Sequence, residues 1–212
     1  WQGISRAIRQ QPDPLEPDAS LLVIEDLDGQ VGLVQAGVLE IHPWGSRMDD
    51  VERPDQMVFD LDPGEGVSWE QIVQGARDVK ARLQDLGLES FLRISGGKGL
   101  HICVPLVRRR GWDETKDFTH ALATAMMRDD PGRYIDSLSK QKRKGRIFVD
   151  YLRNGRGATA VASYSTRARK GAPVATPVRW DELSADLKPN QYTVHNIRQR
   201  LASLKSDPWE GY

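Results

Sequence analysis

The chain has 212 residues, of which 39% are hydrophobic, and this content is enough to bury one substantial core. It has 30 basic and 30 acidic side chains and no net charge, and no apolar run reaches the roughly 18 residues that a membrane span needs. The single cysteine, Cys103, excludes an internal disulfide and a cysteine-based zinc site. The composition therefore indicates a globular protein of a reducing compartment, with the cytoplasm as the expected location.

The N-terminal quarter is predicted to be an accessory segment. Residues 1–20 are polar and contain three prolines, which indicates an irregular lead-in. A short apolar run over residues 21–24 predicts a strand, and residues 31–39 predict a helix. We therefore assign residues 1–45 to a lead-in and accessory segment, and residues 46–212 to the main domain.

The main domain begins with a strand and an amphipathic helix. Met57–Asp62 is predicted to be a strand, and apolar residues recur at helical spacing over Trp69–Leu86. Ser68 and Gln71 have the spacing of a capping box at the start of this helix, and Gly87 is placed to end it.

Two further strands, a second helix and a fourth strand follow. The helix is expected to begin at Asp113 as N-cap and to bury Phe118, Ala121, Leu122, Ala125 and Met126. The predicted strands are Ser90–Ile94, Leu100–Val104 and Arg146–Tyr151, with a later strand at Ala158–Ser163 and a final helix at Gln191–Leu204. The order βαββαβ predicts an α+β, ferredoxin-like or RRM-like fold, with two helices on one face of an antiparallel sheet and the other face open.

Alternation along the strands brings three carboxylates together. Apolar Phe59 and Leu61 must face the helices, so Asp60 and Asp62 point to the other face. The same reasoning places Phe148 and Asp150 of the fourth strand, and His101 and Cys103 of the third, on that face. In a ferredoxin-like sheet the first strand lies between the third and fourth. Asp150 and His101 are therefore expected to flank the Asp60/Asp62 pair.

Three clustered carboxylates repel one another unless a cation neutralises them, and hard oxygen ligands suit Mg²⁺ or Mn²⁺. Two such ions can activate an attacking hydroxyl and stabilise a leaving pyrophosphate. Taken alone, Asp60-Leu61-Asp62 is also compatible with a polar strand end that only aids solubility. Asp150 on the adjoining strand favours metal binding.

Phosphate-binding chemistry is indicated by the glycine-rich loop Ser95–Gly99, which has the sequence SGGKG. Its glycines let backbone N–H groups approach an anion, and Lys98 adds a point charge. The spacing is not that of a Walker loop, and a flexible hairpin turn is the alternative.

Basic residues are concentrated between Arg108 and Lys170, where there are sixteen Lys and Arg but only seven Asp and Glu, with a dense basic cluster over Lys140–Arg146. Its position just before Asp150 favours phosphate binding over a solvated loop.

Several stretches together resemble the polymerase domain of bacterial ATP-dependent DNA ligase D, a member of the archaeo-eukaryotic primase superfamily. The resemblance covers almost everything after about residue 20. The stretches are Leu39–Ser46 (LEIHPWGS), Phe59–Pro63 (FDLDP), Ser95–His101 (SGGKGLH), Arg146–Asn154 (RIFVDYLRN), Gly157–Ala162 (GATAVA) and Trp180–Leu183 (WDEL).

The resemblance implies a primase-like catalytic domain over residues 46–212, ending in a strand and a helix. It implies a template-dependent nucleotidyltransferase, a primase-polymerase of bacterial non-homologous end joining that adds nucleotides, preferably ribonucleotides, with Mn²⁺. The implied partners are nucleoside triphosphates, DNA ends or a primer-template, the Ku protein and a ligase domain. The implied location is the bacterial cytoplasm, in association with the nucleoid.

The same resemblance implies the roles of individual residues. Asp60, Asp62 and Asp150 are implied to be catalytic ligands of two Mn²⁺ or Mg²⁺ ions, and Asp150 is also placed to accept the proton of the primer hydroxyl. The implied nucleotide-binding residues are His42, Ser95, Gly96, Gly97, Lys98, His101, Arg143 and Arg167.

Domains of this family have about eighty more residues before the point that corresponds to Trp1, so an N-terminal part with contacts to template and 5′-phosphate is expected to be missing. A stand-alone relative and an excised piece are both compatible with the sequence.

Two other functions remain open. A metal-dependent nuclease uses similar carboxylates but has no triphosphate to bind, and an inactive nucleic-acid-binding module would present aromatic residues such as Phe91 and Phe148 on its open face.

Overall fold

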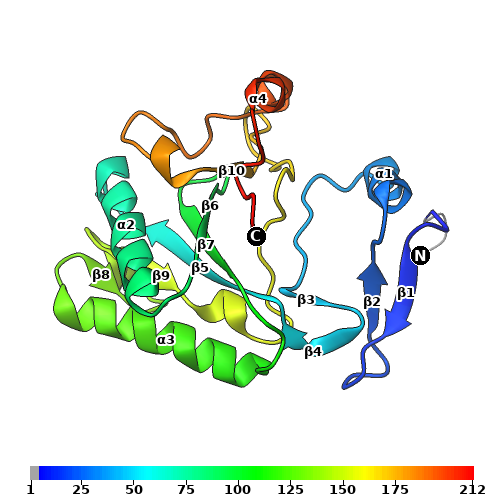
Figure 1. The fold of residues 1–212 in the computed structure, drawn as a ribbon, viewed down its shortest axis with the longest axis horizontal. Helices are drawn as coiled ribbons and strands as arrows, with labels where there is room; N and C mark the ends of the chain where they lie inside the picture. Colours follow the sequence, from blue (N-terminus) through cyan, green and yellow to red (C-terminus); the bar gives the residue numbers. More distant parts are fainter. Residues whose placement is uncertain (1–4) are drawn as a thin grey trace. The chain divides into compact units, whose positions relative to one another are not determined.

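The computed structural model describes residues 5–212, apart from the side chain of Lys140. The first four residues of the predicted lead-in, and the Lys140 side chain of the basic cluster, lie outside the described part. The chain divides into two compact units, with the boundary between Ile41 and His42 (Figure 1).

The smaller unit contains a β-hairpin and one short helix. Strand β1 (Arg9–Pro12) pairs antiparallel with β2 (Ser20–Val23). Helix α1 (Leu27–Gln35) begins after Asp26, whose carboxylate accepts a hydrogen bond of 2.8 Å from an N–H of the first turn. The irregular lead-in was therefore a wrong prediction at β1, and the helix begins before the predicted Val31. Pairing with β2 forms strand β1, and the Asp26 cap sets the start of α1. Hydrophobic periodicity predicts neither strand pairing nor helix caps.

The larger unit is built on a six-stranded sheet with the order β10-β6-β7-β5-β9-β8. The central strand β5 is antiparallel to both of its neighbours, β7 and β9. The predicted βαββαβ order is confirmed as β5-α2-β6-β7-α3-β9. The strands are β5 (Gln56–Pro63), β6 (Phe91–Ile94), β7 (Leu100–Pro105), β8 (Tyr134–Ile135), β9 (Ile147–Asp150) and β10 (Thr176–Val178), and a separate hairpin is formed by β3 (Ser46–Arg47) and β4 (Asp50–Pro54).

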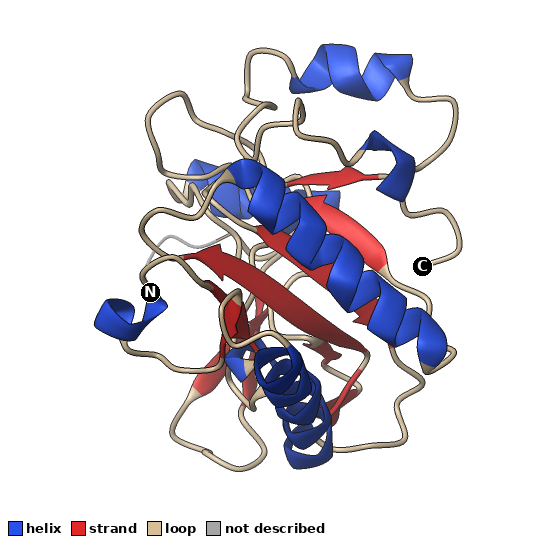
Figure 2. Cartoon of the chain, turned by 90° about the vertical axis from the view of Figure 1, so that its left-hand side faces the viewer, coloured by secondary structure: helices blue, strands red, loops and turns tan. Residues whose placement is uncertain are grey.

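Two long helices, α2 (Trp69–Asp85) and α3 (Trp112–Asp129), cover one face of the sheet, and Figure 2 shows both in front of the strands. The capping box of α2 is present: the Gln71 N–H donates to Ser68 Oγ (3.4 Å), and the Ser68 N–H donates to Gln71 Oε1 (2.8 Å). Gly87 follows the helix with a φ of 72°, a conformation that favours glycine. The core between sheet and helices includes Phe59 and Leu61, as the alternation predicts.

Helix α3 differs from its prediction in where it begins and which face it buries. Its N-cap is Gly111, not Asp113. The Trp112 side chain is buried, and its Nε1–H donates to the Val51 carbonyl oxygen (3.0 Å). This anchor fixes the rotation of the helix, which leaves Phe118 exposed. Of the other predicted inner residues, Leu122 and Met126 are buried, Ala125 is half-buried and Ala121 is exposed.

The C-terminal part also departs from the sequence prediction. Residues 158–163 do not form a strand, and β10 (Thr176–Val178) instead pairs with β6 at the edge of the sheet. The final helix, α4 (Ile197–Ser203), is shorter than predicted. A turn precedes it, in which the Asn196 carboxamide oxygen accepts a hydrogen bond of 2.7 Å from the Thr193 N–H. A short edge strand such as β10 and a side-chain-capped turn such as the one before α4 show no hydrophobic periodicity, so the sequence pattern does not predict them.

The sheet face opposite the helices is covered, so the prediction of an open face was wrong. Phe148 and Cys103 on this face are buried, and His101 is only 4% exposed. Trp209, from the C-terminal segment, lies against the Arg93 guanidinium, whose carbon is 5.5 Å from a ring centroid. None of the helices within residues 5–212 combines the length and the apolar character that crossing a bilayer requires.

Candidate active site

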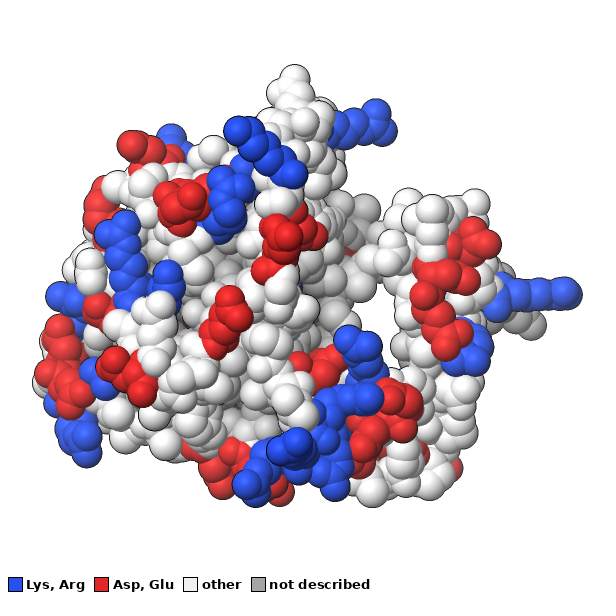
Figure 3. Space-filling model, in the orientation of Figure 1, with Lys and Arg blue, Asp and Glu red and all other residues white. Residues whose placement is uncertain are grey.

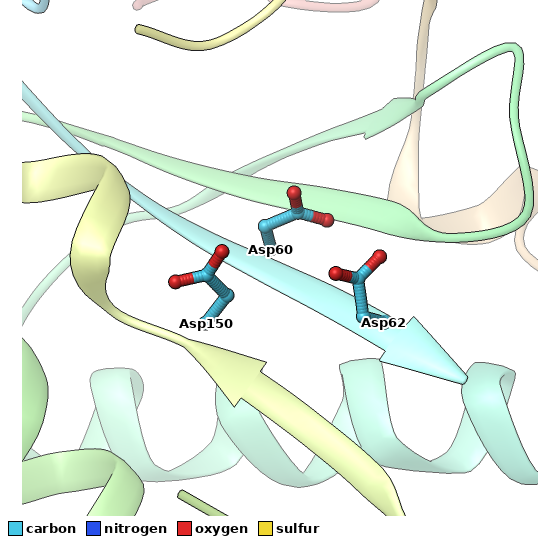
Figure 4. Close-up of side chains that lie close together, drawn as sticks. All are labelled: Asp60, Asp62 and Asp150. Carbon is cyan, nitrogen blue, oxygen red and sulfur yellow. The ribbon is translucent and has the colours of Figure 1, made fainter. Parts of the chain in front are cut away.

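Three aspartates converge on the covered face of the sheet (Figure 4). Asp60 and Asp62 are alternate residues of β5, and Asp150 ends β9 directly opposite Asp60 in the strand register. Each contributes a carboxylate oxygen, and these oxygens all lie within 4.8 Å of one another. Such a group of hard oxygen ligands could bind divalent metal ions.

Asp60 is the most enclosed of the three and has two cationic or polar neighbours. Its Oδ2 accepts a hydrogen bond from Arg153 Nε (3.2 Å), and its Oδ1 lies 3.5 Å from His101 Nε2. The other ring nitrogen, Nδ1 of His101, is 3.0 Å from a guanidinium nitrogen of Arg93. Because a guanidinium only donates hydrogen bonds, Nδ1 must accept, and the neutral ring carries its proton on Nε2, toward Asp60.

The pKa values of the three carboxyls are driven apart. Burial would raise the pKa of Asp60, but attraction to His101 and Arg153 outweighs it and lowers that pKa below its ordinary value. Burial, followed by repulsion from Asp60 and Asp150, raises the pKa of Asp62 to about 6. Burial and the Asp60 charge raise the pKa of Asp150, against a hydrogen bond that its Oδ1 accepts from the Leu152 N–H (2.8 Å). Without a cation, the cluster therefore holds excess negative charge.

We expect metal-free protein to lose stability as the pH rises through the titration range of Asp62. The folded state keeps a proton up to a pKa of about 6, whereas the unfolded chain releases it near its ordinary pKa of 3.8. The free energy of unfolding should therefore decrease between those two values and stay lower above them. The melting temperature of wild type and Asp62→Asn, measured in a chelator, tests this. The variant should lack that decrease, and parallel curves for the two proteins would contradict the expectation.

The glycine-rich loop, residues 95–99, joins β6 to β7 beside the aspartates. The Ser95 hydroxyl donates to the Gly99 carbonyl oxygen (2.9 Å) and accepts a hydrogen bond from the Gly97 N–H (3.2 Å). A Cβ on Gly99 would lie 2.2 Å from the Leu61 carbonyl oxygen, so only glycine lets the loop pack this closely against β5. Gly96 has a φ of 67°, which likewise favours glycine.

A cavity of about 330 Å³ connects this loop to the aspartates. Four of its lining residues are the cations Lys98, Arg153, Arg167 and Arg169. By contrast, basic and acidic side chains are interspersed over the face of the larger unit shown in Figure 3. The cavity therefore suits a small, highly charged anion better than this outer face does.

The structure brings most of the predicted site residues to the cavity. Within the described part of the chain, the lining does not include Gly96, Arg143 or Asp150, although Asp150 belongs to the carboxylate cluster. The predicted residues that do line the cavity are His42, Asp60, Asp62, Ser95, Gly97, Lys98, His101 and Arg167.

Arg143 approaches Asp62 without lining the cavity. Its Nη1 is 3.9 Å from Asp62 Oδ2, its guanidinium carbon is 3.8 Å from the ring centroid of Phe148, and its Nε donates to the Ser137 carbonyl oxygen (3.1 Å). It therefore contributes positive charge to the carboxylate cluster.

Arg153 and Arg169 were missed in the sequence analysis. Arg153 lies three residues after Asp150, on a short 3-10 helix (Leu152–Asn154) that begins after β9 has ended, so no single strand or helix period links the two residues. Arg169 is separated by one residue from Arg167, which the sequence analysis did identify.

Similar proteins with known names identify the family of the chain. The family model described as "LigD, primase-polymerase domain" matches residues 2–209. The multifunctional non-homologous end joining protein LigD of Pseudomonas aeruginosa is 44% identical over 201 residues, which cover 94% of this chain and 24% of that protein. The LigD protein of Mycolicibacterium smegmatis is 34% identical over 164 residues, covering 76% of this chain and 22% of that protein. The chain thus spans about a quarter of the length of these relatives.

Among solved structures, the polymerase domain of Mycobacterium tuberculosis ligase D in complex with DNA matches with a TM-score of 0.85 and 28% sequence identity. The match covers 95% of this chain and 73% of that one. The fold, the sequence motifs and the family model agree, and the resemblance noted from the sequence is confirmed. The chain belongs to the LigD primase-polymerase domain family.

Proposed function

We propose that the chain is a template-dependent nucleotidyltransferase that adds nucleotides to DNA ends by a two-metal mechanism. The observation that carries the proposal is the juxtaposition of three carboxylates, all within 4.8 Å, with a cavity lined by four cations. The carboxylates suit the metal ions. The cationic side chains suit the triphosphate, which the metal ions would also bind.

Asp60, Asp62 and Asp150 are proposed as the metal ligands. They fit divalent cations because the raised pKa of Asp62 reports negative charge that the protein itself does not neutralise. Bound there, two Mn²⁺ or Mg²⁺ ions would lower the pKa of the primer hydroxyl and neutralise the leaving pyrophosphate. Asp150, whose own pKa is raised, is proposed to accept the proton of that hydroxyl.

The triphosphate is proposed to bind in the cavity, with its oxygens facing Lys98 and Arg167. The Arg167 Nη1 already donates to the Ser95 carbonyl oxygen (2.7 Å), which fixes the guanidinium at the base of the glycine-rich loop. His101 lines the same cavity. The remaining proposed nucleotide contacts are His42, Ser95, Gly96, Gly97, Arg143 and Arg169.

The two alternative functions are supported less well. A nuclease needs the carboxylates but gains nothing from a cation-lined cavity beside them. An RNA-binding sheet needs exposed aromatic residues, whereas Phe148 is 1% and Phe91 is 6% exposed. The covered sheet face therefore favours the enzyme.

The names of the relatives suggest the biological setting. They are non-homologous end joining proteins, and the matching solved structure is in complex with DNA. We propose that this chain acts in the same process, in the bacterial cytoplasm at the nucleoid, on broken DNA ends, with the Ku protein and a ligase domain as partners.

Primer extension on a recessed duplex with Mn²⁺ tests the proposed nucleotidyltransferase activity, comparing the four ribonucleotides with their deoxy forms. Ribonucleotide addition is the expected result, and no addition of either kind would overturn the proposal.

Lys98→Ala is expected to weaken binding of a nucleoside triphosphate by roughly tenfold or more, because one charge-assisted contact is worth about 1.5–3 kcal/mol. Mn²⁺ binding in the absence of nucleotide should change much less, since Lys98 is proposed to contact the phosphates and not the metal-binding carboxylates. Calorimetric titration of nucleotide and of Mn²⁺ measures both. The exposed Lys188 provides a control substitution, Lys188→Ala. Equal nucleotide affinity in Lys98→Ala and Lys188→Ala would remove the loop from the nucleotide site.

A further inference from the structure

Arg153 occupies the space between two of the three carboxylates. Its Nε lies 3.2 Å from Asp60 Oδ2 and 3.5 Å from Asp150 Oδ2, and its Nη2 lies 3.2 Å from the same Asp60 oxygen. The attraction is mutual, because Asp60 and Asp150 raise the pKa of Arg153 against the opposing effect of burial. The guanidinium thus neutralises the part of the cluster that faces it.

The backbone that carries Arg153 is fixed, but its side chain has room to move. The residue belongs to a 3-10 turn, Leu152–Asn154, directly after β9. Asn154 ties this turn to β5 by hydrogen bonds to the Val58 N–H (2.7 Å) and carbonyl oxygen (2.8 Å). The Arg153 side chain remains 39% exposed and lines the cavity.

A metal ion and this guanidinium compete for the same oxygens. An ion such as Mg²⁺ binds carboxylate oxygens at about 2.0–2.1 Å and needs their lone pairs directed at itself. Oδ2 of Asp60 and Oδ2 of Asp150 are both directed at Arg153. A guanidinium left in place would also stand within a few ångström of the ion, where like charges in a partly buried site repel strongly.

We propose that Arg153 is the counter-cation of the carboxylate cluster in the metal-free protein, and that metal binding displaces its guanidinium from Asp60 and Asp150 to another part of the cavity. There it joins Lys98, Arg167 and Arg169 around the triphosphate. The inference rests on the metal site of the proposed function. Arg153 then holds the Asp60 and Asp150 carboxylates together before the ions arrive, and it weakens the binding of those ions.

The consequence is a gain in metal affinity when Arg153 is removed. Arg153→Gln should bind Mn²⁺ about tenfold more tightly than wild type in the absence of nucleotide, because the ion no longer has to break a charge-assisted contact. Calorimetric titration with Mn²⁺ alone, at about pH 8 so that Asp62 is ionised in both proteins, measures this. Arg82→Gln removes the same charge from an exposed pair with Asp129 and should leave Mn²⁺ affinity unchanged. Unchanged or weaker binding by Arg153→Gln would overturn the inference.

Two further variants complete the test. Arg153→Lys keeps a charge but offers a single contact, so its Mn²⁺ affinity should lie between those of wild type and Arg153→Gln, and it serves if the glutamine variant does not fold. Asp60→Asn should abolish Mn²⁺ binding. If Mn²⁺ binds equally well to Asp60→Asn, the proposed metal site itself is wrong. If Asp60→Asn loses Mn²⁺ but removal of Arg153 changes nothing, only the counter-cation role fails.

Discussion

Replacing Asp60 or Asp150 by asparagine is expected to lower the rate of nucleotide addition by about a thousandfold or more, because each change removes a proposed ligand of metal ions whose charge stabilisation is worth several kcal/mol. The fold should survive. Asp150 repels Asp60 in the metal-free protein, so removing either charge relieves this repulsion, although Asp60→Asn also gives up the attraction to His101 and Arg153 that lowers the pKa of Asp60. Primer extension with saturating Mn²⁺ measures the rate, and thermal unfolding in a chelator checks the fold.

Asp117, an exposed carboxylate on α3, provides the matched control. Asp117→Asn removes the same charge away from the cavity and should leave extension unchanged. Near-normal extension by Asp60→Asn or Asp150→Asn would show that the residue concerned is not a metal ligand. Loss of activity together with early unfolding would instead identify a structural role.

The largest loss of stability is expected at Asn154, which is 2% exposed. Its carboxamide accepts from the Val58 N–H and donates to the Val58 carbonyl oxygen, taking the place of a strand neighbour at that point of β5. Asn154→Ala leaves both backbone groups buried without these partners. It should lower the free energy of unfolding by at least about 3 kcal/mol. Urea denaturation followed by circular dichroism measures the change.

Asn154→Asp separates the two hydrogen bonds, since aspartate keeps the acceptor for the Val58 N–H but loses the donor to the carbonyl oxygen. It also introduces a buried charge, so it should destabilise the protein at neutral pH and less so in acid. The exposed Asn190 supplies a neutral control, Asn190→Ala. A loss below about 1 kcal/mol for Asn154→Ala would mean that solvent replaces the carboxamide.

The sequence was informative wherever burial imposed a period. Phe59 and Leu61 face the core because a central strand with helices on one side must alternate, and that alternation places Asp60 and Asp62 together. The capping box at Ser68 was equally readable, because its two hydrogen bonds depend on residue types at a fixed spacing. The position of Asp150 opposite Asp60 followed from strand order and not from any local signal.

What the sequence did not reveal depends on contacts between distant segments. The cover over the second sheet face uses Trp209, more than a hundred residues from its partner Arg93. Arg153 and Arg169 reach the cavity through short turns and irregular backbone, where side-chain direction follows no period. The rotation of α3 depends on the anchor at Trp112, whose hydrogen bond to the Val51 carbonyl oxygen no pattern within the helix reports.

The register of β5 against β9 has a consequence for how the chain folds. The two strands pair over only four positions, with Asp60 opposite Asp150 and Leu61 opposite Val149. A slip by one residue during folding would turn every side chain of one strand to the other face and force carboxylates against the helices. Burying unpaired charges is costly enough to make such mispaired states short-lived. The aspartates proposed to bind the metal ions therefore also disfavour mispaired sheets during folding. A variant in which they are replaced by neutral residues is expected to form mispaired strands more often, even where its native state is more stable.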